Sequence, residues 1–134
     1  MHFISDAEAA SLVDHEIAFT AIQEALVAAS TPAAVSFPVV HGHGSDNANS
    51  FSIKASATES LAGLKVGSYW PGNMEHGLPR HNSLILLLDQ ECGKMSAAIE
   101  AGKVNAYRTA AADAVAAHYL SRENSSVVAV FGTG

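Results

Sequence analysis

Two isolated cations, Arg108 and Lys65, are the residues of this chain best suited to chemistry. Arg108 follows Asn105, whose side chain is typical of a helix cap, so the guanidinium is expected about one turn inside a helix. Free amide groups, the positive end of the helix dipole and a guanidinium could there converge on one anion, such as a carboxylate held by two parallel hydrogen bonds. The plainer interpretation is a solvated arginine at the start of an exposed helix.

Lys65 interrupts an apolar stretch, Leu61-Ala62-Gly63-Leu64-Lys65-Val66-Gly67, that predicts a strand. Strand alternation places its side chain on the opposite face from Leu64 and Val66, so it faces either a cleft or solvent. Lys54, in a neighbouring predicted strand, raises the same question.

Aromatic residues and histidines follow the Lys65 strand. Tyr69-Trp70-Pro71-Gly72-Asn73 could wall a small-molecule pocket or simply pack in a turn. His81 follows Gly77-Leu78-Pro79-Arg80 and could exchange protons near neutral pH, although a surface histidine is the commoner case. His41-Gly42-His43-Gly44 reads as a glycine loop that would preorganise a metal poorly. No other Cys, His or carboxylate falls at a recognised zinc spacing, so no metal site is predicted.

The last residues form a separate motif. Val127–Phe131 predicts a buried parallel strand, and Gly132-Thr133-Gly134 a turn in which Gly132 and Gly134 approach a pyrophosphate, as at the opening of a dinucleotide-binding unit. The third glycine, the phosphate-binding helix and the ribose ligand would lie beyond Gly134. The chain is therefore expected to be the N-terminal portion of a cofactor-dependent enzyme. The alternative is an apolar strand with a glycine tail, because a bare Gly-x-Gly is a weak motif.

Helices, a sheet and a further helix must position these groups. Ser5 and Glu8 have the spacing of a capping box, which predicts helices between Ala7 and Ala29 that meet near Asp14. The spacing of apolar residues and the clusters of turn residues predict an α+β domain over residues 1–122, with helices and a mostly antiparallel sheet. Residues 123–134 are expected to form the first strand of a truncated Rossmann α/β domain. The expected strands are residues 1–4, 34–40, 50–57, 61–69, 83–89 and 95–100, and the expected long helix is 106–122.

Composition excludes several classes of protein. The net charge of −6, with seven lysines and arginines, argues against a nucleic-acid partner. No apolar run approaches the roughly 20 residues that span a bilayer, so no membrane partner is expected. The N-terminus lacks the pattern of a secretion signal, and the single cysteine, Cys92, fits a reducing compartment, so the protein is expected in the cytoplasm.

Taken together, these stretches resemble the ornithine cyclodeaminase/mu-crystallin family. The resemblance rests on Gly63-Leu64-Lys65-Val66 followed by Pro71-x-Asn73, and on Gly77-Leu78-Pro79-x-His81 leading into Leu84–Asp89 and Gly93. Its most specific part is Arg108-Thr109-Ala110-Ala111 followed by the terminal Gly-x-Gly. The sequence of Tyr69–Asn73 is closer to that of the imino-acid reductase and alanine dehydrogenase branch than to that of the ornithine enzymes.

The resemblance implies a homodimer and a Rossmann domain that binds NAD(H) or NADP(H), with hydride transfer at the carbon of a C–N bond next to a carboxylate. It implies that Lys65 and Arg108 bind this carboxylate and polarise the imine or keto group, and that Thr109 reaches the cofactor. His81 and Asn73 are carried over as substrate-binding residues.

The predicted function is therefore an NAD(P)-dependent oxidoreductase of small 2-imino or 2-amino acids. The chain alone is expected to be inactive. The alternatives are an ornithine cyclodeaminase, which releases ammonia and forms proline, and a non-catalytic, mu-crystallin-like ligand-binding protein. One departure from the family concerns an arginine that closely follows a proline in an early strand of many members. Phe37-Pro38-Val39-Val40-His41 offers none, so either His41 replaces it or the ligand is missing.

Overall fold

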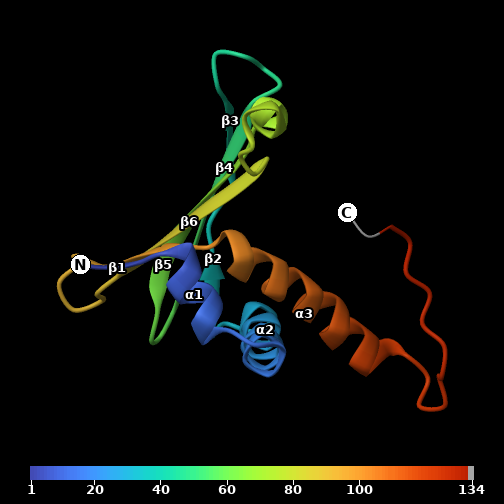
Figure 1. Ribbon diagram of the computed structural model, residues 1–134. Helices are drawn as coiled ribbons and strands as arrows, with labels where there is room; N and C mark the ends of the chain where they lie inside the picture. The colour runs from blue at the N-terminus through green and yellow to red at the C-terminus, as the bar shows by residue number, and fades with distance from the viewer. Residues whose placement is uncertain (133–134) are drawn as a thin grey trace.

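The computed structural model describes residues 1–132 and shows a twisted seven-stranded sheet with helices packed on it (Figure 1). The strand order is β1-β7-β6-β5-β4-β2, and β3 pairs with β4 beside β2. Only the β1–β7 pair is parallel; every other pair in this sheet is antiparallel. The strands are β1 (His2–Ile4), β2 (Ala34–Ser36), β3 (Val40–His43), β4 (Ser50–Thr58), β5 (Ala62–Tyr69), β6 (His81–Leu88) and β7 (Met95–Glu100).

The register divides the central strands into two chemically different faces. Lys54 of β4 pairs with Lys65 of β5, which pairs with Ile85 of β6, so these three side chains share one face. The neighbouring positions lie on the opposite face and are all apolar. This apolar face includes Ile53, Ala55, Leu64, Val66, Leu84 and Leu86.

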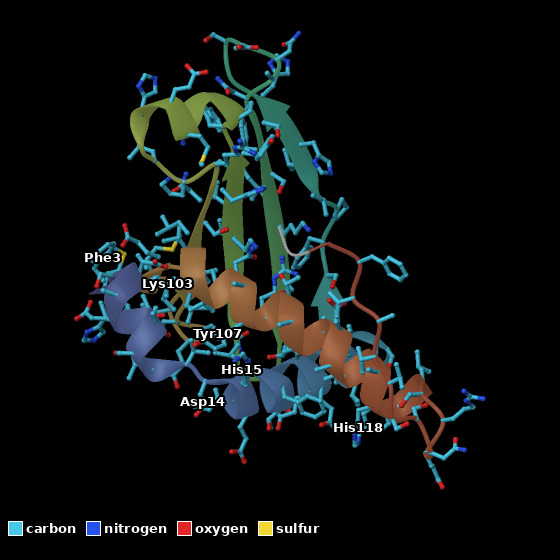
Figure 2. All side chains as sticks on the ribbon, turned by 45° about the vertical axis from the view of Figure 1, so that its right-hand side comes forward. Phe3, Asp14, His15, Lys103, Tyr107 and His118 are labelled. Atoms are coloured by element: carbon cyan, nitrogen blue, oxygen red, sulfur yellow. The ribbon has the colours of Figure 1, made fainter. Side chains whose placement is uncertain are left out.

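Three helices form a second layer: α1 (Asp6–Leu12), α2 (His15–Ala29) and α3 (Gly102–Leu120). The capping box of Ser5 and Glu8 starts α1, and Asp14 caps α2 by accepting from the Ile17 N–H at 2.8 Å, so both predicted helix starts are confirmed. The rings of His15 and Tyr107 meet between α2 and α3, with centroids 4.9 Å apart (Figure 2).

Small residues bring these helices close together. The buried apolar residues of the described chain are five alanines and Val115, with no larger side chain among them. Ala9, Ala18 and Ala111 come from the three different helices. Among the described residues, none of the helices combines the length and apolar character that crossing a bilayer requires.

The long strands extend beyond the helical layer. The ends of β4, β5 and β6 project past α3 to a tip formed by β3 and the short 3-10 helix η1 (Pro71–His76) (Figure 1). The sheet therefore offers a polar surface just above the N-terminal half of α3, on the face from which Lys65 projects.

The prediction that Asn105 caps the long helix is wrong. The helix α3 begins at Gly102, and Asn105 lies inside its first turn. The carboxylate of Asp6 takes over the capping role, because its Oδ1 accepts from the Lys103 N–H at 2.9 Å. The expected convergence of free amides with Arg108 is therefore not formed, since Asp6 occupies the helix start.

One predicted strand and one predicted loop also differ from the structure. The strand expected over 34–40 is divided into β2 and β3, because Pro38 lacks the N–H that a ladder requires. The supposed glycine loop at His41–Gly44 is mostly strand β3, in which Gly42 lies against the ring of Phe51.

The strand predicted over 127–131 is not formed within the described chain, where Val127 and Phe131 are 86% and 98% exposed. A parallel strand exists only when paired with neighbours, and no partner strand lies beside this segment in residues 1–132.

Candidate functional site

The centre of the candidate site is the side-chain amide of Asn105, on which Lys65 and Arg108 converge. Lys65 Nζ donates to Asn105 Oδ1 at 2.7 Å. Arg108 donates to the same oxygen from Nε at 3.0 Å and from Nη2 at 2.9 Å. A strand and a helix that are 40 residues apart in the chain are thus joined through one oxygen atom.

Local structure explains why these three residues meet. Asn105 and Arg108 are three residues apart in α3, a spacing that puts both side chains on the same helix face. Lys65 lies near the middle of β5, with Lys54 directly opposite on β4. Its side chain leans along the strand, because its Cε lies only 3.5 Å from where a Cβ on Gly67 would stand. The missing side chain at Gly67 leaves room above the strand.

An open cleft of about 400 Å³ surrounds this group, with its floor on β4, β5 and β6 and one wall on α3. Besides the three central residues, its charged and titratable lining residues are Lys54, Tyr69, His41 and His81. The described lining contains no aspartate and no glutamate. The cleft is therefore a cationic site with hydrogen-bonding hydroxyls, among them those of Ser52 and Ser83.

The electrostatics of the cleft act on Lys65. Burial lowers the pKa of Lys65, and the positive charges of Arg108 and Lys54 lower it further. No carboxylate of the lining compensates this effect. An anionic ligand would restore the stability of the charged lysine, so the site is built to receive negative charge.

Of the other predicted substrate residues, His81 lines the cleft and Asn73 does not. His81 opens β6 and stacks against Tyr69 in the cleft, with ring centroids 4.7 Å apart. His41 also lines the cleft, from β3. Asn73 is not among the lining residues; its Nδ2 donates to the Pro79 carbonyl at 2.8 Å and holds the loop that contains η1.

Of the predicted cofactor residues, Thr109 lies on α3 and Gly132 lies at the margin of the described chain. Thr109 is exposed beside Arg108, and its hydroxyl donates to the Asn105 carbonyl at 2.7 Å. Gly132 has a φ of 85°, a left-handed conformation that favours glycine. Gly134 lies outside the described residues.

Reasoning from the sequence missed Asn105 as a residue of the site. Its spacing to Arg108 was the available signal, because a helix beginning before Asn105 puts the two side chains on one face. Placing the helix start at Asn105 removed that inference. For metals, within residues 1–132 no three His, Cys, Asp or Glu side chains gather in a way that could hold an ion.

Comparison with known proteins identifies the family of the chain. Residues 1–134 match the model of the ornithine cyclodeaminase/mu-crystallin family, and the chain belongs to this family. An iminosuccinate reductase of Paracoccus denitrificans is 36% identical over 137 residues, which cover 100% of this chain and 42% of that protein.

Solved structures show the same fold. An archaeal alanine dehydrogenase dimer with bound NAD superposes with a TM-score of 0.88 at 30% identity, over 94% of this chain and 39% of that one. The Paracoccus denitrificans iminosuccinate reductase in complex with NAD+ gives a TM-score of 0.86 at 34% identity, over 92% of this chain and 39% of that one. The chain thus spans about two fifths of the length of the relatives it matches.

Proposed function

We propose that the protein carrying this chain is an NAD(P)-dependent oxidoreductase of small 2-imino or 2-amino acids, of the imine reductase or amino-acid dehydrogenase type. Residues 1–122 would form its substrate-binding and dimerisation domain, and residues 123–134 would open a Rossmann domain. The observation that carries the proposal is the convergence of Lys65 and Arg108 in a cleft whose described lining has no carboxylate.

In the proposed mechanism, Lys65 and Arg108 hold the carboxylate that flanks the reacting carbon. A guanidinium matches a carboxylate in geometry, and an ammonium adds a compact positive charge. Fixing this group orients the adjacent C–N carbon, and the positive charge of Lys65 polarises the imine or keto group. When bound, a nicotinamide would supply the hydride that converts the protonated imine into an amine, or accept it in the reverse direction.

The residues present are compatible with such a cofactor. Gly132 adopts a conformation in which a phosphate-binding turn uses glycine, and Gly134 would complete the Gly-x-Gly pair. Thr109 is exposed on α3 next to Arg108, and we propose that it contacts the cofactor. Whether the cofactor is NAD(H) or NADP(H) depends on a ribose-binding residue beyond Gly134.

The charge of the cleft favours a substrate with two carboxylates. Lys54, Lys65 and Arg108 contribute three positive charges to the lining, and one carboxylate would offset only one of them. Lys54, directly opposite Lys65 in the sheet, is placed to favour a second carboxylate. A dicarboxylic imino acid therefore fits the cleft better than a monocarboxylic one, in keeping with the name of the Paracoccus relative.

A homodimer is proposed from the sheet. Helices α2 and α3 lie on one side of the sheet (Figures 1 and 2). The opposite face is apolar across three strands and extends to Phe3 on β1, whose side chain is 61% exposed. A continuous apolar face of this kind is typical of an interface, and a second copy of the chain is the occupant we propose.

The proposal is tested by following NAD(P)H absorbance in the full-length, cytoplasmically expressed protein. We expect cofactor oxidation with oxaloacetate plus ammonium, and a lower kcat/KM with pyruvate plus ammonium. Release of ammonia from ornithine without turnover of any imino acid would instead establish a cyclodeaminase. Saturable binding of an imino acid without turnover would establish a mu-crystallin-like binding protein.

A further inference from the structure

The unusual feature of the cleft is the neutral acceptor at its centre. Lysine and arginine side chains can only donate hydrogen bonds, so the atom of Asn105 that faces them must be its oxygen. This oxygen accepts one N–H from Lys65 and two from Arg108. A carboxylate would be the ordinary partner for two cations brought together, and the chain places an amide there instead.

The choice of amide over carboxylate has a physical consequence. A carboxylate between Lys65 and Arg108 would satisfy both side chains and neutralise one of their charges, so an incoming anion would have to compete with it. An amide offers only a dipole. It holds the two cations at fixed positions but leaves their charge available to a ligand.

Asn105 is itself held firmly enough to fix its partners. Its N–H donates to the Ala101 carbonyl at 3.0 Å, and its carbonyl accepts from the Thr109 hydroxyl at 2.7 Å. Its side chain is half-buried between α3 and β5. The rotamers of two long side chains are thus restricted before a ligand arrives, which lowers the entropic cost of binding.

We infer that Asn105 is a positioning residue, which aims Lys65 and Arg108 at a single substrate carboxylate while leaving both cations unneutralised. The inference rests on the proposed function in taking that ligand to be the carboxylate of an imino or amino acid. The charged groups that lower the pKa of Lys65 are Arg108 from α3 and Lys54 from β4. The other titratable side chains that line the cleft are those of His41, His81 and Tyr69.

Two variants of the full-length protein, Asn105→Asp and Asn105→Ala, separate this role from simple packing. Asn105→Asp keeps the shape of the side chain but adds a competing negative charge. We expect it to bind oxalate, a small dicarboxylate probe measured by calorimetric titration, about 10- to 150-fold more weakly, the range of one charge-assisted hydrogen bond. Asn105→Ala frees the two cations without neutralising them, and we expect about a tenfold loss.

The pH dependence of oxalate binding provides the readout that a packing role would not change. Binding by the unmodified protein weakens as Lys65 loses its proton at high pH. The new carboxylate in Asn105→Asp raises the pKa of Lys65, so this weakening should move to higher pH, whereas in Asn105→Ala it should not. Thermal unfolding measured in parallel should show Asn105→Asp at least as stable as the unmodified protein, since it relieves the repulsion between cations.

The outcomes distinguish this inference from the proposed function. Oxalate binding that is equal in Asn105→Asp and the unmodified protein, or equal pH profiles in both variants, would overturn the positioning role. Absence of oxalate binding to the unmodified protein would overturn it too, because the two cations would then form no carboxylate site. Oxalate binding with the expected order of affinities, but without turnover of any imino acid, would support the positioning role and reject the proposed reaction.

Discussion

Replacing Lys65 with methionine should have opposite effects on activity and stability. Methionine keeps much of the apolar stem of lysine and removes its charge, while Asn105 Oδ1 keeps the two hydrogen bonds from Arg108. The variant therefore removes one cation from the cleft without leaving Asn105 Oδ1 unpartnered. The two effects follow from separate physical terms.

The expected loss of activity is worked from one charged hydrogen bond. Such a bond to a substrate carboxylate contributes about 1.5–3 kcal/mol, and each 1.36 kcal/mol corresponds to a tenfold change in rate. We therefore expect kcat/KM for an imino acid to fall about 10- to 150-fold in the full-length protein, measured by NAD(P)H absorbance with oxaloacetate plus ammonium.

The expected gain in stability follows from the lowered pKa of Lys65. The folded protein disfavours the charged lysine, mainly through burial and then through Arg108 and Lys54. At neutral pH the charged lysine therefore costs folding free energy, and removing it should raise the midpoint of thermal unfolding.

A kcat/KM within about twofold of the unmodified protein would refute the substrate role given to Lys65. A fall in stability would refute the electrostatic argument. Lys94→Met, an exposed lysine in the β6–β7 turn, is the matched control, and it should change neither quantity.

Three further predictions follow from the same structure. The kcat/KM of the full-length protein should begin to decline at a pH below the ordinary pKa of a lysine, because Lys65 binds anions only when protonated and its pKa is lowered. A kcat/KM that stays constant up to the pKa of a free lysine would contradict this. Gly42→Ala should lower the free energy of unfolding by about 1–3 kcal/mol, since its Cβ would lie 2.8 Å from Phe51 Cε1; denaturant unfolding measures this, and adding Phe51→Ala should remove the clash. Asp6→Ala should cost about 1 kcal/mol through loss of the cap on α3, whereas Asp6→Asn, which keeps an acceptor, should lose little.

Much of the local structure was predictable from the sequence because its signals are short-range. The capping box at Ser5 and Glu8, the helix start at Asp14 and the turn before β7 each depend on residues that are close together in the chain. Strand alternation likewise predicted that the Lys65 side chain lies on the opposite face of the sheet from the side chains of Leu64 and Val66. The family, too, was predicted from motifs and their order along the chain.

The start of α3 was not predictable in the same way. Asp6 caps this helix from 97 residues away, and the parallel pairing of β1 with β7 and the packing of α1 beside α3 bring the two together. Among residues near the helix in the chain, Asn105 is a good cap by type, so the local pattern predicted the helix start there. Likewise, the 127–131 segment has the composition of a strand, but a strand forms only where partner strands lie beside it.

The sequence by itself determined that Lys65 lies in an apolar strand and Arg108 in a helix of small residues, because residue type and the spacing of apolar residues are properties of the chain alone. It also determined the family, through the motifs around Lys65 and Arg108. Only the tertiary structure decided that these two cations meet at one oxygen of Asn105, and that no acidic residue joins them in the described lining. The reason is that alternation specifies the face on which a side chain lies, whereas sheet register and helix packing decide what that face contacts.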